Sequence, residues 1–179
     1  MTSPVAIVIL NWNNAPDTLA CLASVAQLDY PAYWTLVVDN GSTDGSVAAI
    51  RAARPEVEIL ETGENLGYAG GNNVGIRHAL AQGADYILVL NNDVTLAPDC
   101  LSRLVAVAAS DESAGMIGPM IYQGGTSNQI QSAGTLMDRR GRWHQRGLNT
   151  LDSGQFDRET SADSLVGCAL LIPARVLET

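Results

Sequence analysis

The strongest constraint in the sequence is an alternation of short apolar runs with segments of helical periodicity. The runs are four to six residues long and rich in Val, Ile and Leu, which is typical of strands buried on both faces. Strands are predicted at Val5–Leu10, Thr35–Val38, Val57–Leu60, Tyr86–Leu90 and Gly115–Met120. Helices are predicted at Thr18–Leu28, from a cap at Thr43 or Asp44 to Ala53, at Tyr68–Ala81 and at Pro98–Ala109. This order predicts an α/β fold with a mostly parallel sheet flanked by helices.

The character of the chain changes after Met120. Gly, Ser, Asn and Gln dominate the next residues, and Ile130–Arg146 has the pattern of a hairpin that turns near Arg140 and Gly141. A polar loop is predicted at Leu148–Ser161, followed by a strand at Ser164–Pro173. We therefore divide the chain into an α/β part, residues 1–120, and a second region, residues 121–179.

Charge limits the classes of ligand. The formal net charge is -9, and all ten basic side chains are arginines, because the 179 residues include no lysine. Such a chain repels phosphate backbones, so nucleic acid is not an expected partner. A small phosphorylated ligand remains compatible, held by backbone amides or a bridging metal ion.

Cysteine usage and hydropathy bear on the cellular compartment. The three cysteines are far apart without a CxxC spacing, which favours small buried side chains over a zinc site or disulfides. No apolar segment approaches the roughly 20 residues that span a bilayer. We expect a cytoplasmic protein, with the inner face of the cell membrane as an alternative site of action.

Polar residues follow each of the first four predicted strands. The segments are Asn11-Trp12-Asn13-Asn14, Asp39-Asn40-Gly41-Ser42, Asn65-Leu66-Gly67 and Asn91-Asn92-Asp93. One Asn- or Asp-rich terminus is an ordinary turn. In a parallel sheet, however, all four lie at one edge, where α/β proteins bind ligands. The sequence therefore predicts a polar cleft there.

Familiar nucleotide and hydrolase motifs do not occur. The first strand is not followed by GxGxxG, which makes a dinucleotide oxidoreductase a remote alternative. GxxxxGK[ST] and GxSxG are also missing.

The polar cleft nevertheless offers groups that suit a nucleoside diphosphate sugar. Trp12 can stack on a base, or else pack beneath the sheet. Asp39 can accept the imide N–H of a pyrimidine. Gly67 begins a glycine-rich helix start, with Gly70 and Gly71, where backbone amides can approach a diphosphate. Asp93 can hold a divalent cation as a Lewis acid.

Four segments together resemble family 2 glycosyltransferases. They are IVILNWNN (7–14), VVDNGSTDGS (37–46), ENLGYAGGNNVGIRHA (64–79) and LVLNNDV (88–94). The likeness extends from Val5 to about Thr179, and the NWN and NNDV forms are most similar to the bacterial rhamnosyltransferase-type branch. It implies an inverting, metal-dependent enzyme with the GT-A fold that builds cell-surface polysaccharide from dTDP- or UDP-sugars, dTDP-rhamnose among them.

The resemblance also implies roles for individual residues. Asp93 takes the place of the metal ligand for Mg²⁺ or Mn²⁺, while Asn91 replaces the first aspartate of the family's DxD motif. The donor-binding residues implied by the resemblance are Asn11, Trp12, Asn13, Asp39, Asn65, Gly67, Asn73 and Asn92.

The general base has no counterpart in the chain. In the family an acidic pair lies a little beyond the segment that matches Gly167–Arg175, and this sequence stops at Thr179. The catalytic base is therefore unknown, and residues 121–179 are expected to be the incomplete start of an acceptor-side region. We expect donor binding with little transfer, and self-association through an uncovered apolar surface. A non-catalytic nucleotide- or sugar-binding module of the same fold is the alternative function.

Four arginines, Arg139, Arg140, Arg142 and Arg146, crowd the predicted hairpin. Such clusters are commonly solvated turns. The functional alternative is contact with an acidic partner, such as a polyprenyl-linked diphosphate acceptor or anionic lipid headgroups at a membrane surface.

Overall fold

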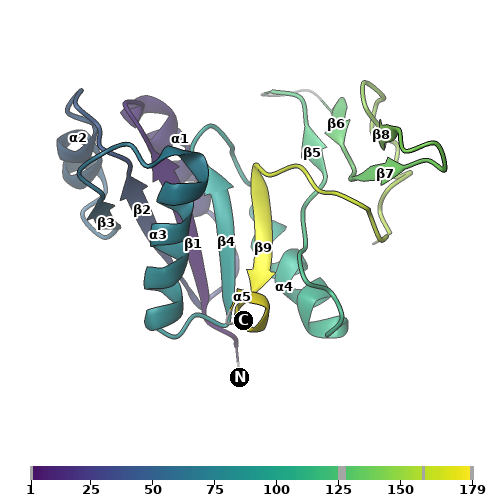
Figure 1. Cartoon of the computed structure of the whole chain (residues 1–179), viewed down its shortest axis with the longest axis horizontal. Coiled ribbons are helices and arrows are strands. Elements are labelled where there is room, and N and C mark those ends of the chain that lie inside the picture. The colour runs from purple at the N-terminus through teal and green to yellow at the C-terminus, as the bar shows by residue number, and fades with distance from the viewer. Residues whose placement is uncertain (1, 125–127, 159, 178–179) are drawn as a thin grey trace.

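A five-stranded sheet forms the centre of the computed structural model, which describes residues 2–124, 128–158 and 160–177. Its strand order is β3-β2-β1-β4-β9 (Figure 1). The strands are β1 (Val5–Asn11), β2 (Tyr33–Asp39), β3 (Glu58–Glu61), β4 (Tyr86–Asn91) and β9 (Ala169–Pro173). The first four are parallel and β9 is antiparallel to β4, so the predicted α/β class with a mostly parallel sheet is confirmed.

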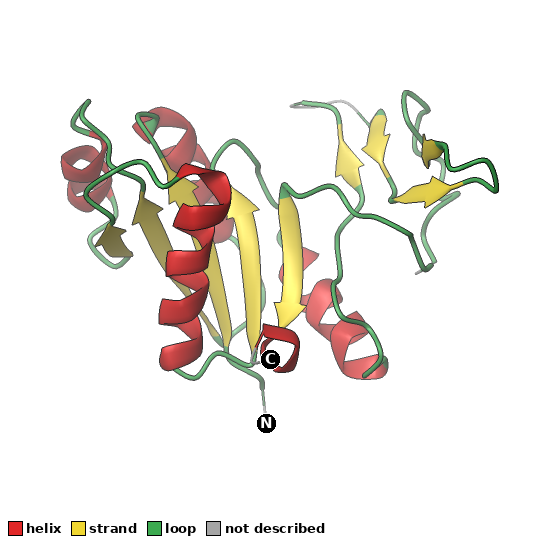
Figure 2. Ribbon diagram, in the orientation of Figure 1, coloured by secondary structure: helices red, strands yellow, loops and turns green. Residues whose placement is uncertain are grey.

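Helices cover both faces of the sheet (Figure 2). They are α1 (Ala15–Val25), α2 (Ser46–Ala53), α3 (Gly67–Ala81), α4 (Cys100–Ser110) and the short α5 (Ala174–Leu177). Alternate residues of β1 point to opposite faces, as the pleat requires. Ile7 packs in the core that includes side chains of α1, α2 and α4, whereas Val8 packs in the core beneath α3. None of the helices in the described residues is long and apolar enough to cross a membrane.

The strand order places a topological switch point between β1 and β4. The chain runs from β1 outward to β2 and β3, and then returns through α3 to β4 on the other side of β1. In open α/β sheets, ligands bind in the crevice outside the carboxyl ends of the strands at such a point. The register brings polar residues to that edge, because Asn11 pairs with Asp39 and Leu10 pairs with Asn91.

Helix boundaries differ slightly from those predicted. The first helix begins at Ala15 rather than Thr18 because Asn14 caps it and Pro16 fits its first turn. The second helix has Gly45 as its N-cap, with no side-chain cap, so the predicted cap at Thr43 or Asp44 was wrong. Asp44 instead accepts hydrogen bonds from the backbone and hydroxyl of Ser46.

The predicted strand at Gly115–Met120 was wrong. Of these residues, only Ile117 forms a bridge, with Leu171 on the outer edge of β9. Pro119 has no N–H for a ladder and the glycines weaken an extended segment, so pairing does not spread. The two Ile117–Leu171 backbone bonds, 2.9 and 2.8 Å long, occupy part of the edge of β9.

Residues between Met120 and Ala169 form two small sheets beside the main one (Figure 1). Strands β5 (Ile121–Tyr122) and β6 (Ile130–Ser132) pair with each other, as do β7 (Thr135–Met137) and β8 (Trp143–Gln145). The hairpin is shorter than the predicted Ile130–Arg146: it consists of β7 and β8, with its turn at Gly141 (φ +76°), whereas Ile130–Ser132 pairs with β5. The last strand is shorter than predicted and enters the sheet where Ala169 pairs with Leu90, at the carboxyl end of β4.

Close packing of α3 depends on two glycines one helical turn apart. A methyl group added at Gly75 would lie 2.5 Å from Cγ1 of Val8 and 2.8 Å from Cγ2 of Val38. One added at Gly71 would lie 2.4 Å from Cδ1 of Leu10. These distances are far below van der Waals contact; Leu10 can turn its flexible end away from Gly71, whereas the short branched side chains of Val8 and Val38 leave no room for a methyl group at Gly75.

We predict that Gly75→Ala destabilises the protein despite the higher helix propensity of alanine. Overpacking a core typically costs about 1–3 kcal/mol, whereas the propensity gain is about 1 kcal/mol. Urea unfolding should show a lower midpoint than for the unmodified protein. The matched control is Gly115→Ala, where an added methyl meets nothing within 4 Å. Equal midpoints for the two variants would contradict the packing argument.

Candidate nucleotide site at the carboxyl edge

The centre of the candidate site is a buried carboxylate at the end of β2. Asp39 is 3% exposed, and Asn11 beside it is 0% exposed. The Asn11 amide donates to Oδ1 of Asp39 at 2.8 Å, and the backbone N–H of Ser42 donates to Oδ2 at 2.9 Å. A carboxylate offers about four acceptor positions, so each oxygen retains capacity for one more donor.

The loop after β1 is fastened to the loop after β2. Asn13 donates its backbone N–H to Oγ of Ser42 at 2.9 Å, and its side-chain oxygen accepts from the backbone N–H of Thr43 at 2.8 Å. Asn13 adopts φ 49°, a left-handed conformation that Asn tolerates better than most residues. Trp12, in the same loop, is 54% exposed, so its ring does not pack beneath the sheet.

The segment before α3 is held by Asn40, which is also buried. Its side-chain oxygen accepts from the backbone N–H of Leu66 at 3.0 Å, and its amide donates to Oδ1 of Asn65 at 2.9 Å. The same Asn65 oxygen accepts from the N–H of Gly67 at 2.8 Å. The structure thus brings Asn65 and Gly67 to the edge that carries Asp39, while Asn73 is exposed on the second turn of α3.

Three segments hold Asn91 at the end of β4. Its backbone N–H donates to the Cys168 carbonyl at 2.8 Å, and its carbonyl lies 3.7 Å from the Cys21 thiol, which donates to it. The single hydroxyl proton of Tyr68 is shared between the side-chain oxygen of Asn91, at 3.0 Å, and the Gly167 carbonyl, at 2.8 Å. Burial, followed by the nearby charge of Asp93, raises the pKa of Cys21 to about 12, so this thiol stays protonated.

The two residues after Asn91 differ in their surroundings. Asn92 is half-buried and donates to the hydroxyl of Thr18 in α1 at 3.1 Å. Asp93 is exposed, and its charge contributes, after burial, to a raised pKa at Tyr68 and Cys168. Asp93 is therefore within electrostatic reach of both side chains, with its carboxylate open to a ligand.

The donor set limits what metal the edge can hold. Among the described residues, no three His, Cys, Asp or Glu side chains form a metal-binding group. A structural zinc centre therefore does not fit. One exposed carboxylate does fit Mg²⁺ or Mn²⁺, which keep waters and take further oxygen ligands from phosphates.

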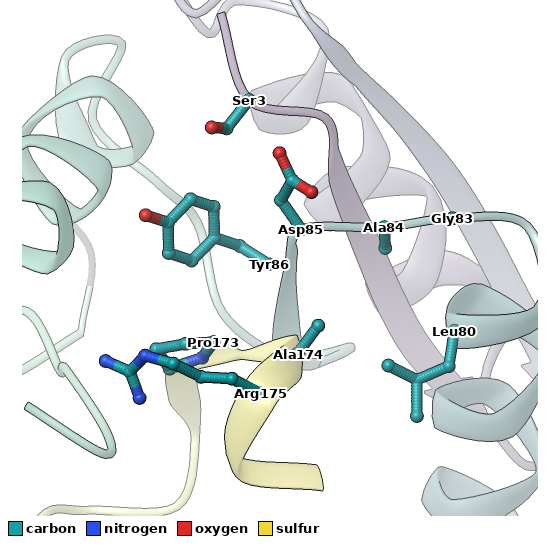
Figure 3. Close-up of a pocket in the computed structure, with 9 residues that line it drawn as sticks. All are labelled: Ser3, Leu80, Gly83, Ala84, Asp85, Tyr86, Pro173, Ala174 and Arg175. Atoms are coloured by element: carbon teal, nitrogen blue, oxygen red, sulfur yellow. The ribbon is translucent and has the colours of Figure 1, made fainter. Parts of the chain in front are cut away.

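A separate pocket lies at the other end of the sheet (Figure 3). Ser3, Tyr86 and Arg175 are among the residues that line it, at the amino ends of β1 and β4. Arg175 donates to the Ala114 carbonyl at 2.9 Å. This pocket is remote from Asp39 and Asp93, which lie after the carboxyl ends.

Sequence reasoning missed three residues that connect the candidate site. They are Thr18, Asn40 and Tyr68, described above. Asn40 follows Asp39 directly and belongs to the motif VVDNGSTDGS, so its position was a usable signal. The contacts of Thr18 and Tyr68 join segments 74 and 99 residues apart, which no local pattern reveals.

The class of protein follows from this fold together with its similarity to solved structures. GT-A glycosyltransferases have a mostly parallel sheet of this kind, and solved structures of that class match the chain. A mannosyltransferase from Pyrobaculum calidifontis, in complex with GDP-Man and Mn²⁺, aligns with TM-score 0.61 and 26% identity over 69% of this chain and 36% of that one. TarS 1–349 from S. aureus aligns with TM-score 0.62 over 98% of this chain and 48% of that one, at 16% identity, which supports the fold alone.

The family follows from the sequence comparisons. The model for Glycosyl transferase family 2 matches residues 6–169, and the chain belongs to this family. An N-acetylglucosaminyl-diphospho-decaprenol L-rhamnosyltransferase of Mycobacterium tuberculosis is 33% identical over 129 residues, covering 68% of this chain and 42% of the relative. The galactofuranosyltransferase GlfT1 of the same species is 32% identical, covering 68% and 40%.

A third relative is an N-acetylglucosaminyltransferase of Bradyrhizobium elkanii, 29% identical over 65% of this chain and 66% of the relative. Together these relatives place the chain in the rhamnosyltransferase-like part of the family. The chain spans less than half the length of the two mycobacterial proteins.

Proposed function

We propose that these residues bind a nucleoside diphosphate sugar, and that the protein to which they belong transfers the sugar, with inversion, to a saccharide or polyprenyl-linked acceptor. The observation that carries the proposal is that one edge of the sheet carries both a buried carboxylate, Asp39, and an exposed one, Asp93. The names of the relatives, which include a rhamnosyltransferase acting on a decaprenol-linked sugar, support the acceptor class.

Asp39 is proposed to read a pyrimidine base. Its remaining acceptor capacity suits the imide N–H of uracil or thymine, a charge-assisted bond worth roughly 1.5–3 kcal/mol. Trp12 is exposed and lies in the loop that bonds to Ser42, and its ring is proposed to stack on the base. UDP- or dTDP-sugars, including dTDP-rhamnose, are therefore the proposed donors. The remaining donor contacts are proposed for Asn13, Asn65, Gly67, Asn73 and Asn92, with Asn11 acting from behind Asp39.

Asp93 is proposed to hold Mg²⁺ or Mn²⁺ against the diphosphate. The cation supplies Lewis acid stabilisation of the leaving diphosphate when it is bound. Asp93 is the one carboxylate in the segment Asn91-Asn92-Asp93. The side-chain oxygen of the neutral Asn91 already contacts the Tyr68 hydroxyl. The phosphates themselves are then needed to complete the coordination sphere, so metal and nucleotide should bind together.

The alternative of a non-catalytic binding module differs only in the transfer step. Asp152 accepts from the Tyr122 hydroxyl, and Asp163 accepts from the backbone N–H of Met137. These carboxylates serve local structure in the second region, and the general base is not assigned. Donor binding is common to both functions, whereas turnover of a sugar nucleotide by the full-length protein distinguishes them.

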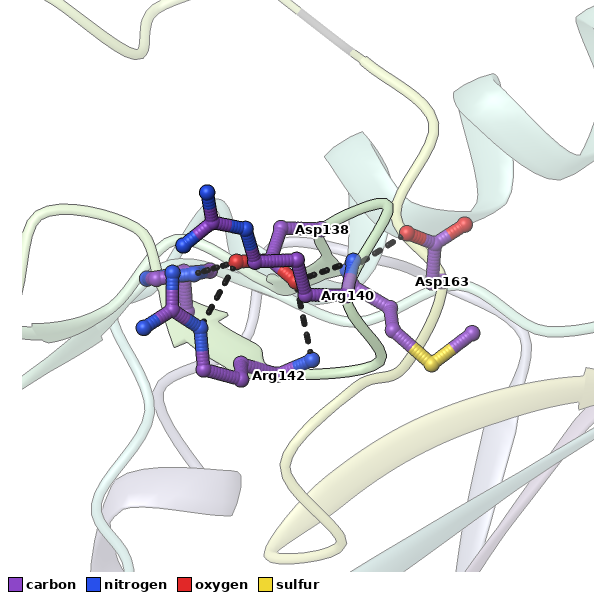
Figure 4. Close-up of polar contacts among 6 residues, drawn as sticks. Asp138, Arg140, Arg142 and Asp163 are labelled. Carbon is purple, nitrogen blue, oxygen red and sulfur yellow. Dashed lines mark hydrogen bonds and ion pairs between the residues drawn. The ribbon is translucent and has the colours of Figure 1, made fainter.

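The β7–β8 hairpin is proposed to contact an anionic membrane surface. Asp138 organises its turn by accepting from the backbone N–H groups of Arg140 and Arg142 and from the Arg142 guanidinium (Figure 4). These bonds, with one from His144, hold the pKa of Asp138 well below its usual range. Within the described part of the chain, no carboxylate forms an ion pair with the guanidinium group of Arg139 or Arg140.

Apolar side chains accompany these arginines. Met137 and Trp143 pair directly across the hairpin and are 51% and 57% exposed. Exposed Trp beside Arg is typical of segments that lie at a membrane interface. We propose that membrane contact by this hairpin brings a lipid-linked acceptor towards the donor site.

We predict metal-dependent nucleotide binding. UDP or dTDP should bind more tightly in Mn²⁺ than in chelator by calorimetry, and Asp93→Asn should remove most of the difference. Asp111→Asn is the control, because that carboxylate bonds to Ser113 beyond the end of α4 and should leave the difference intact. Equal affinities of the unmodified protein with and without metal would overturn the metal role.

We predict that Trp12→Ala weakens UDP or dTDP binding by about 1–3 kcal/mol, the usual range for base stacking on an aromatic side chain. The loss should persist in chelator, because stacking does not involve the metal. Trp143→Ala is the matched control, since Trp143 is similarly exposed but lies in the hairpin. Unchanged affinity of a folded Trp12→Ala protein would exclude stacking.

We predict binding to phosphatidylglycerol vesicles but not to phosphatidylcholine vesicles in a sedimentation assay at low salt. Arg139→Ala with Arg140→Ala should weaken binding by about 1 kcal/mol per arginine. The control is Arg51→Ala with Arg54→Ala, which also removes two positive charges, but from α2 and its C-terminal end. In the unmodified protein Arg51 pairs with Glu61, and Arg54 pairs with Glu56. Equal loss in both double variants would indicate a general charge effect and not a hairpin surface.

A further inference from the structure

A chain of hydrogen bonds crosses the carboxyl edge from the loop after β4 to the end of β2. The Asn92 amide donates to Oγ1 of Thr18 at 3.1 Å, and Thr18 donates to Oδ1 of Asn11 at 2.7 Å. Asn11 then donates to Oδ1 of Asp39 at 2.8 Å. Thr18 and Asn11 are 0% exposed, so water does not compete for the Thr18–Asn11 and Asn11–Asp39 bonds.

The single proton of Thr18 sets the direction of this chain. A hydroxyl that accepts from the Asn92 amide donates its own proton to Oδ1 of Asn11, with the Asn14 carbonyl at 3.0 Å as a shared acceptor. The oxygen of the Asn11 side chain therefore faces Thr18, and its NH₂ group faces Asp39. The opposite amide orientation would place that oxygen against the Asp39 carboxylate, which is repulsive.

The position of Thr18 explains how one side chain contacts both Asn11 and Asn92. It lies in the first turn of α1, on the side of the helix that faces the sheet, between the end of β1 and the loop after β4. A change in the position of Asn92 therefore alters the hydroxyl that orients Asn11. No charged group has to move, because every link is a neutral amide or hydroxyl except the terminal Asp39.

We propose that Thr18 is a positioning residue that couples base recognition at Asp39 to the metal-binding loop Asn92–Asp93. The inference rests on the proposed function, because it assigns the base to Asp39 and the metal to Asp93. It goes beyond that function because it predicts that the base-binding end and the metal-binding end of the nucleotide site are energetically linked. The link is the Thr18 side chain on the buried face of α1. Coupling of this kind is reciprocal for equilibrium binding.

The test compares Thr18→Val, which keeps the shape and removes the hydroxyl, with Thr18→Ser, which keeps the hydroxyl. Affinity for UDP and for dTDP is measured by calorimetry in chelator and in Mn²⁺, alongside thermal unfolding. Two quantities are expected to fall in Thr18→Val: the metal-free affinity, by about three- to tenfold, and the ratio by which Mn²⁺ improves it. Thr18→Ser should restore both towards the values of the unmodified protein.

Ser24→Ala is the matched control. Ser24 is also in α1 and accepts from the Leu96 N–H in the loop after β4, at 3.1 Å, but does not reach Asn11 or Asp39. It should lower thermal stability without changing either binding quantity. If Thr18→Val behaves like Ser24→Ala, or changes only one quantity, the coupling is overturned. If the unmodified protein binds neither nucleotide, the proposed function itself fails.

A measurement on the unmodified protein makes the test independent of the folding of Thr18→Val. Uridine and thymidine carry no phosphate to reach the metal-binding loop. Saturating either nucleoside without metal should shift the side-chain amide resonances of Asn92 in an NMR spectrum. Binding that shifts resonances at Asn11 and Ser42 while leaving Asn92 unmoved would overturn the coupling.

Discussion

The arrangement of the polar edge depends on the burial of the Asp39 carboxylate. A buried charge is costly unless hydrogen bonds satisfy it, so its partners must be placed accurately. Those partners, Asn11 and Ser42, belong to the ends of two adjacent strands, and Ser42 also accepts from Asn13. Satisfying one carboxylate therefore fixes the loop after β1, which carries the exposed Trp12, against the loop after β2.

The same edge is held from the α3 side by contacts of a different kind. Glycines bring α3 against β1 and β2, and the Asn40 side chain beside Gly71 bonds to the segment that leads into the helix. Tyr68, one residue into α3, then bonds to Asn91 and Gly167. The glycines set the distance between α3 and the sheet. Asn40 and Tyr68 can form their side-chain bonds only at that distance, and these bonds in turn hold α3 in place.

Much of this architecture was predictable because buried parallel strands have continuous apolar sequences. Val5–Leu10 and Tyr86–Leu90 are such runs, and both lie within strands of the structure. Gly115–Met120 is also largely apolar, but Pro119 and its glycines oppose pairing, so an apolar composition alone does not make it a strand. The edge that carries Asn11, Asp39 and Asp93 followed from strand order, whereas Thr18 and Tyr68 act through contacts between distant segments that depend on the packed fold.

The neutral residue at Asn91 has an electrostatic consequence for the proposed site. A second carboxylate near Asp93 would raise affinity for a free cation, but it would also repel the diphosphate whenever the cation is absent. With Asn91 bonded to Tyr68, the loop presents one charge, which is a weak site for a cation alone. The diphosphate then supplies the remaining charge, so cation and nucleotide favour each other's binding. An acidic protein of net charge -9 can in this way accept an anionic donor without a lysine to attract it.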